Sequence, residues 1–121
     1  MSLSQAAAVE AAIEAKPGSV GGSPISGSTI YKVMGKMFAI LTTRRTQNVI
    51  LKCDPHLAEI LREQYDGVGH RSHLDRRFWI CVYLDTDVPL DETERLIAQS
   101  YELVCAGLTR KQRAELQALA S

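Results

Sequence analysis

Short apolar runs separated by polar turn residues occupy the middle of the chain, a pattern typical of β-strands. The runs 30–34 and 37–42 flank Gly35-Lys36, which is the two-residue spacing of a tight hairpin. A third run, 48–52, follows the polar tip 43–47. These runs predict an antiparallel meander of three strands.

Two more strands are predicted further along the chain, at 68–74 and 76–84. Basic residues interrupt the pattern of the first, whereas the second is apolar on both alternating faces and is expected at the centre of the sheet. Trp79 lies on this central strand, and core packing is favoured for it over stacking against a ligand. One face carries Phe78, Ile80, Val82 and Leu84, and the other carries Trp79, Cys81 and Tyr83.

Four helices are predicted from capping residues and from apolar positions three and four residues apart. Ser4 begins the first helix, and Pro17-Gly18 ends it. Asp54 is a natural N-cap for the second helix, with Pro55 in its first turn. Capping-box spacings begin the third helix at Asp91 and the fourth at Thr109. The predicted helices are 4–15, about 55–65, about 90–106 and a short terminal segment.

Ten of the twelve residues from 17 to 28 are Gly, Ser or Pro. This composition buries too little surface to order itself, which predicts a flexible loop. A phosphate-binding loop would lead into a helix, but a strand follows here. The whole chain, 1–121, is therefore expected to be a single domain of two-layer α+β fold. Its mostly antiparallel sheet is covered by helices, in the order α-β-β-β-α-β-β-α-α.

The charge balance argues against a dedicated nucleic-acid-binding domain, since such domains are usually strongly basic. The 121 residues include 14 Lys and Arg and 14 Asp and Glu, for a formal net charge of zero. The charges are unevenly spread, because 28–83 holds nine basic and five acidic residues, whereas 84–121 holds four and seven. The middle of the chain is thus mildly basic.

The spacings that catalysis or metal binding requires are missing from the sequence. Cys53, Cys81 and Cys105 each lie in an apolar run, which indicates buried reduced thiols rather than disulfides. His70 and His73 belong to no zinc motif, so neither a metal nor a cofactor is predicted. Without a nucleophile motif, a non-enzymatic protein is expected. No run approaches the ~18 apolar residues of a membrane span, which favours a cytoplasmic location.

Four sequence blocks carry a family resemblance. The longest is 73–89, and the others are Gly-Lys-Met-Phe-Ala at 35–39, Leu-Lys-Cys-Asp-Pro at 51–55 and Ser-Tyr-Glu-Leu-Val at 100–104. Together, in this order, they resemble the MmcQ/YjbR family of small bacterial proteins. The resemblance implies a fold similar to that of secretion chaperones, and it brings the family's label of DNA binding.

Basic side chains gather at two predicted hairpin tips, one at 43–47 and one just before Trp79. If both tips project from one edge of the sheet, they resemble the paired wings proposed for this family. We hypothesise that such wings contact the phosphates of double-stranded DNA weakly and without sequence preference. The alternative is a peptide- or protein-binding module that uses a second apolar sheet face near Trp79 and Tyr83. The candidate nucleic-acid-binding residues are Arg44, Arg45, Arg71, Arg76, Arg77 and Trp79.

Overall fold

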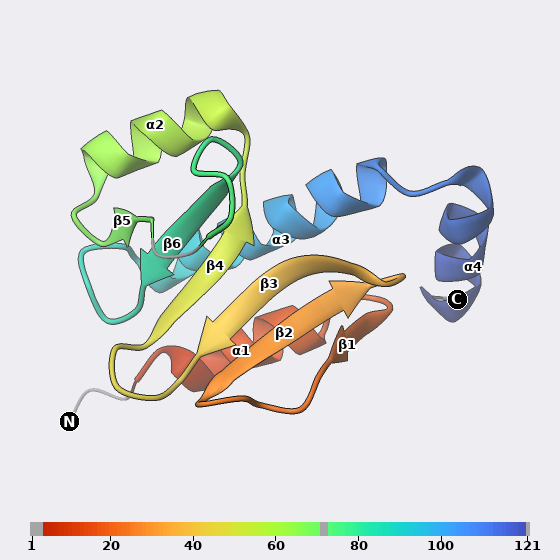
Figure 1. The fold of residues 1–121 in the computed structure, drawn as a ribbon, viewed down its shortest axis with the longest axis horizontal. Coiled ribbons are helices and arrows are strands. Elements are labelled where there is room, and N and C mark those ends of the chain that lie inside the picture. The colour runs from red at the N-terminus through yellow and green to blue at the C-terminus, as the bar shows by residue number, and fades with distance from the viewer. Residues whose placement is uncertain (1–3, 71–72, 121) are drawn as a thin grey trace.

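The computed structural model describes residues 4–70 and 73–120, which form one open sheet with helices packed against it (Figure 1). The predicted α+β class and element order are confirmed, with one strand added after the first helix. The elements in these ranges are α1 (Ala6–Glu14), β1 (Ser19–Gly21), β2 (Ser28–Val33), β3 (Lys36–Thr42), β4 (Asn48–Lys52), α2 (Pro55–Gln64), β5 (Val68–Gly69), β6 (Trp79–Tyr83), α3 (Leu90–Ala106) and α4 (Arg110–Ala120).

The six strands lie in the order β1-β2-β3-β4-β6-β5, and every neighbouring pair is antiparallel. Successive residues of a strand point to opposite faces, so cross-strand rows alternate between the two faces of the sheet. One row consists of Ile30, Ile40, Ile50 and Cys81, and the adjacent row consists of Tyr31, Ala39, Leu51 and Ile80.

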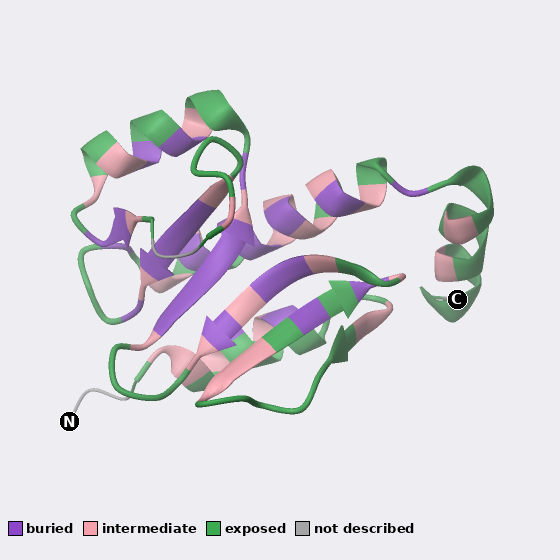
Figure 2. Cartoon of the chain, viewed as in Figure 1, coloured by how far each residue is buried: buried purple, intermediate pink, exposed green. Residues whose placement is uncertain are grey.

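Helices α1 and α3 cover the face that carries the Tyr31 row, and the hydrophobic core lies between them and the sheet (Figures 1 and 2). Val9 and Ile13 of α1 and Ile97 of α3 are fully buried there. The Ser100 hydroxyl ties α3 to the sheet, because it accepts a hydrogen bond from the Lys52 amide (2.9 Å) and donates one to the Phe38 carbonyl (2.6 Å).

The opposite face, which carries the Ile30 row, is here called the open face. Within the described residues, α1 and α3 pack behind β2, β3 and β4, whereas α2 lies at the β5 and β6 side of the sheet. Ile30 at the centre of β2 accordingly keeps 42% of its surface exposed. Ile50 and Cys81 of the same row are buried, so the part of the open face that is available to a ligand is the part formed by β2 and β3.

Two predicted boundaries of the second strand pair are wrong. Strand β5 covers only Val68–Gly69 of the predicted 68–74, of which residues 71–72 lie outside the described residues. Residues 76–78 form a turn rather than the start of a strand, because the Asp75 carbonyl accepts hydrogen bonds from the Phe78 and Trp79 amides (both 3.0 Å). The backbone carbonyl of Asp75 thus closes a turn, and the strand begins only at Trp79.

The N-terminal half differs from the sequence prediction at two points. Strand β1 forms within the predicted loop 17–28, because its backbone pairs with the edge of β2 even though its side chains bury little. The hairpin turn between β2 and β3 consists of Met34 and Gly35 rather than Gly35-Lys36. Their φ angles are +50° and +81°, and both central residues of a type I′ turn have φ above zero.

Candidate functional site

The structure places the two groups of candidate arginines at opposite ends of the sheet. Arg44 and Arg45 lie in the loop before β4, next to the Asn48 end of that strand. Arg76 and Arg77 precede β6, whose first residue, Trp79, pairs with Lys52 at the far end of β4. Four residue steps along β4 separate the groups by about 13 Å. The condition for paired wings at one edge is therefore not met, and Arg71 lies outside the described residues.

Arg77 is engaged in local contacts that hold the turn before β6. Its guanidinium donates to both carboxylate oxygens of Asp75 (2.7 and 3.1 Å) and lies 5.3 Å from the centre of the Phe78 ring. Hydrogen bonds from Arg77 lower the pKa of Asp75 to about 2. Arg76 is exposed, with Glu59 and other residues of α2 nearby. Ion pairing with Asp75 leaves Arg77 less available to a phosphate.

Trp79 is half-buried and does not belong to the core cluster, contrary to the core packing predicted for it. Its backbone carbonyl accepts a hydrogen bond from the Arg62 guanidinium (2.9 Å). The register places Trp79 and Tyr83 on the open face, as the strand alternation predicted. Neither residue lines either of the two depressions described next.

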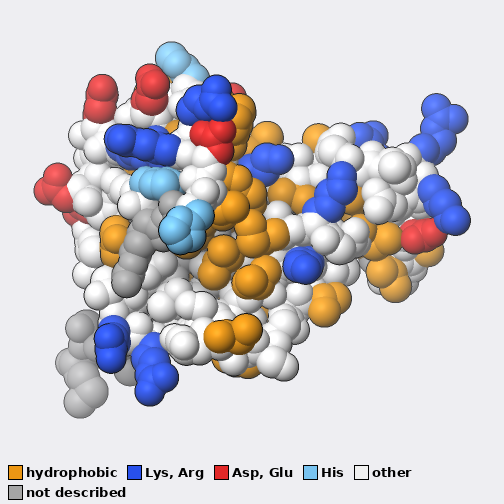
Figure 3. Space-filling model, viewed as in Figure 1, with side chains coloured by type: hydrophobic (Ala, Val, Ile, Leu, Met, Phe, Trp, Pro, Cys, Tyr) orange, Lys and Arg blue, Asp and Glu red, His pale blue; other side chains and the backbone are white. Residues whose placement is uncertain are grey.

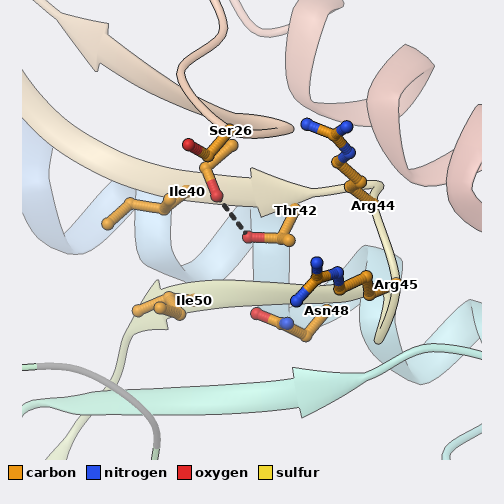
Figure 4. Close-up of a pocket in the computed structure, with 8 residues that line it drawn as sticks. Ser26, Ile40, Thr42, Arg44, Arg45, Asn48 and Ile50 are labelled. Atoms are coloured by element: carbon orange, nitrogen blue, oxygen red, sulfur yellow. Dashed lines mark hydrogen bonds between the residues drawn. The ribbon is translucent and has the colours of Figure 1, made fainter.

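Arg44 and Arg45, in contrast, make no hydrogen bond or ion pair with other residues of the described chain. They border a depression of about 510 Å³, here called the arginine pocket. In Figure 4 the Arg45 side chain lies over the end of β4 beside Asn48, whereas Arg44 extends from the end of β3 in a different direction. The pocket is lined by Ser26, Ser28, Ile40, Thr42, Arg44, Arg45, Asn48 and Ile50.

Three backbone acceptors fix the loop that carries these arginines. The Thr43 amide donates to the Gly27 carbonyl (3.0 Å), and the buried Asn48 amide group donates to the Thr46 carbonyl (2.9 Å). The Gln47 side chain donates to the Thr43 carbonyl (3.2 Å). The stem of Arg44 also packs on Gly27, where a Cβ atom would collide with it. The loop that forms one side of the arginine pocket is therefore held in a fixed conformation.

A second depression of about 960 Å³, here called the apolar groove, adjoins the arginine pocket on the open face. The two share Ser28 and Ile40, so they form one continuous surface. Figure 3 shows a band of hydrophobic side chains across this face with Lys and Arg around it. The apolar side chains that line the groove are Val20, Ile25, Ile30, Met34, Ile40 and Leu119.

The apolar groove collects most of the exposed large hydrophobic side chains of the described residues. Six such side chains are more than a third exposed, and four of them line the groove: Val20 (66%), Ile25 (75%), Ile30 (42%) and Leu119 (67%). A contiguous apolar patch of this kind marks an interaction surface. Sequence reasoning found the face but missed these residues, because they come from β1, the following loop, β2 and the last turn of α4.

The titratable side chains in the described part of the chain are characterised by their burial and by their spacing. Burial is the main cause that raises the pKa of Cys53 to about 11, so its thiol is protonated at neutral pH. Across residues 4–70 and 73–120, no three His, Cys, Asp or Glu side chains gather where they could hold a metal ion. No helix in these ranges is both long and apolar enough to cross a membrane.

Comparisons with known proteins place this geometry in a family. The YjbR family model matches residues 14–103. The chain is 32% identical over 87 residues to the uncharacterized protein YjbR of Escherichia coli strain K12, covering 71% of this chain and 74% of that protein. It is 28% identical over 83 residues to the uncharacterized protein YbdF of Escherichia coli O157:H7, covering 68% of each.

Two crystal structures share the fold. Deinococcus radiodurans protein DR2400, of domain type DUF419, superposes with a TM-score of 0.80 at 28% identity, over 90% of this chain and 85% of its own. A Pseudomonas syringae protein superposes with a TM-score of 0.69 at 20% identity, over 84% of this chain and 98% of its own. With the family model matching most of its length, the chain belongs to the YjbR family.

Proposed function

We propose that this protein is a non-enzymatic binding module that holds an extended segment of a partner protein on its open face. The observation that carries the proposal is the gathering of Val20, Ile25, Ile30 and Leu119 around one groove. Each such side chain contributes ~1.5–3 kcal/mol when a ligand removes it fully from water. A ligand that buries several of these side chains only in part therefore still gains enough free energy to form a specific complex.

The shape and composition of the surface favour a polypeptide over duplex DNA. The centre of the open face is apolar, whereas a DNA interface is polar and strongly basic. In the described residues, Lys32, Arg44 and Arg45 are the cations lining the two depressions, and the formal net charge of the chain is zero. The other arginine group lies at the far end of β4. Weak DNA binding through Arg44 and Arg45 is the second candidate function, and the experiment below distinguishes the two.

The test uses a dye-labelled twelve-residue peptide with alternating valines, Gly-Ser-Val-Thr-Val-Thr-Val-Thr-Gln-Thr-Gly-Ser, in a fluorescence-anisotropy titration. Ile30→Ser should weaken binding ~10-fold, as expected for one apolar contact. Ile60→Ser is the matched control, because Ile60 is equally exposed (45%) but lies on α2, away from the groove. This variant should bind like the wild type.

Two results would contradict the proposal. The first is an equal loss of affinity in both isoleucine variants, and the second is an absence of peptide binding by the wild type. A labelled DNA duplex titrated in parallel decides the alternative. Duplex binding that is lost on replacing Arg44 and Arg45, with no peptide binding, would favour the DNA hypothesis instead.

A further inference from the structure

We infer that the arginine pocket is an anion subsite that recognises an acidic side chain of the segment bound in the apolar groove. The inference rests on the proposed function and specifies its ligand: an extended segment that carries a carboxylate two residues away from an apolar side chain. Arg44 and Arg45 border the pocket and have no partner among the described residues. Guanidinium groups without a partner are suited to bind a carboxylate through paired hydrogen bonds.

The polar side chains of the pocket supply further donors. Ser28 Oγ and Thr42 Oγ1 lie 2.8 Å apart and share one hydrogen bond, which uses one of their two hydroxyl hydrogens. The second hydroxyl hydrogen is left to donate to a ligand. None of the residues lining the arginine pocket or the apolar groove is acidic. The local charge is therefore positive without internal compensation, although the chain as a whole is neutral.

The route from the groove to the pocket sets the spacing of the ligand's residues. Ile40 belongs to both depressions, whereas Thr42, two residues further along β3, lines only the arginine pocket. Two residues of extended chain span about 7 Å. An apolar side chain seated at Ile40 therefore places the side chain two residues away, on the same face of an extended ligand, at Thr42 and the arginines.

The stem of Arg44 is held in place before any ligand arrives. Gly27 has a φ of +83° and receives the stem of Arg44, while the Thr43 amide donates to the Gly27 carbonyl (3.0 Å). The turn formed by Ser26 and Gly27 thus seats the arginine loop. Ordering the stem of Arg44 in advance reduces the entropy lost on binding. The segment 17–28 provides this packing site for Arg44, although its composition alone predicts only a flexible loop.

The experiment compares two peptides, the neutral one above and the same peptide with Glu in place of its Gln, two residues after the last valine. Wild-type protein should bind the Glu peptide about five- to tenfold more tightly, as expected for a partly exposed charge-assisted contact. In the double variant Arg44→Gln/Arg45→Gln this preference should disappear, so that the Glu peptide and the neutral peptide bind with equal affinity. A phosphoserine peptide separates the two sources of anion, since tighter binding than Glu assigns the subsite to phosphate.

The control is Arg110→Gln/Lys111→Gln, which removes the same charge from two adjacent exposed residues at the start of α4. It should keep the preference for Glu. Loss of the preference in this control as well would assign it to overall charge and overturn the inference. Equal binding of both peptides by the wild type would also overturn it and leave the proposed function standing. If the wild type binds neither peptide, both proposals fail together.

Discussion

Individual polar side chains decide how the layers of this molecule are joined. Ser100 is fully buried, and its hydroxyl is the link between α3 and the backbones of β3 and β4. Replacing it leaves the part-buried Lys52 amide and the buried Phe38 carbonyl without this partner. Such groups are costly because no water replaces the lost hydrogen bond.

Ser100→Ala is accordingly expected to lower the free energy of unfolding by ~1–3 kcal/mol, the cost of leaving a buried polar group unpaired. Urea denaturation followed by circular dichroism measures this change. Ser23→Ala is the control, because Ser23 is exposed and makes no hydrogen bond with the described residues. Identical midpoints for the Ser100 variant and the wild type would show that the hydroxyl is dispensable.

The low pKa of Asp75 predicts how the stability of the protein depends on pH. Hydrogen bonds from Arg77 lower its pKa to about 2, so its contribution to stability is present above the ordinary carboxyl pKa. That contribution is lost as the pH falls from about 4, the unfolded-state value, to about 2. An NMR titration should find the low pKa in the wild type, and Arg77→Gln should raise the pKa toward about 4. A wild-type Asp75 that already titrates near 4 would contradict the ion pair.

At the scale of elements, the turn between β2 and β3 shows how backbone geometry fixes a hairpin. Gly35 has a φ of +81°, and a Cβ atom there would meet nothing within 4 Å. Gly35→Ala should therefore destabilise through backbone strain alone, by ~1–2 kcal/mol. Gly22→Ala is the control, because its φ is not in the left-handed region and its nearest contact would be the Ile30 carbonyl at 3.7 Å. Urea denaturation compares them, and equal midpoints would refute the strain.

Sequence patterns predicted the elements that bury apolar side chains and missed those held by backbone pairing. Helix α3 and strand β4 lie close to their predicted ranges, because apolar spacing is encoded locally. The capping box predicted at Asp91 is wrong, since the N-cap of α3 is Pro89 and no side chain caps the helix. Strand β1 was missed, since Ser19 and Gly21 offer no strand propensity and their order comes from pairing with β2. The turn at 76–78 depends on the carbonyl of Asp75, which no periodicity reveals.

The candidate site was predictable only in part for the same reason. Strand alternation placed Trp79 and Tyr83 on the open face. The apolar groove, however, joins Val20, Ile25 and Leu119, which lie in segments too short or too remote for a periodic signal. Arg44 and Arg45 were recognised as basic, yet their separation from Arg76 and Arg77 follows from the register of β4 with β6. Register is a tertiary property.

At the scale of the whole molecule, the net charge and the positions of the arginines determine how tightly duplex DNA is expected to bind. A chain of zero formal net charge whose arginine groups lie at opposite ends of β4 makes few simultaneous phosphate contacts. Duplex DNA is therefore expected to bind no tighter than ~10⁻⁴ M at physiological salt, the weak end of non-specific binding. Fluorescence anisotropy at several salt concentrations measures this affinity. Micromolar binding with a steep salt dependence would refute the expectation.

The two edges of the sheet limit how another chain can pair with it. Strands β1 and β5 are the two outermost strands, and they are only three and two residues long. Such short edges give a neighbouring chain little backbone to pair with, which discourages lateral growth into aggregates. A partner must therefore approach the sheet face-on, through side chains, rather than extend it as an additional strand.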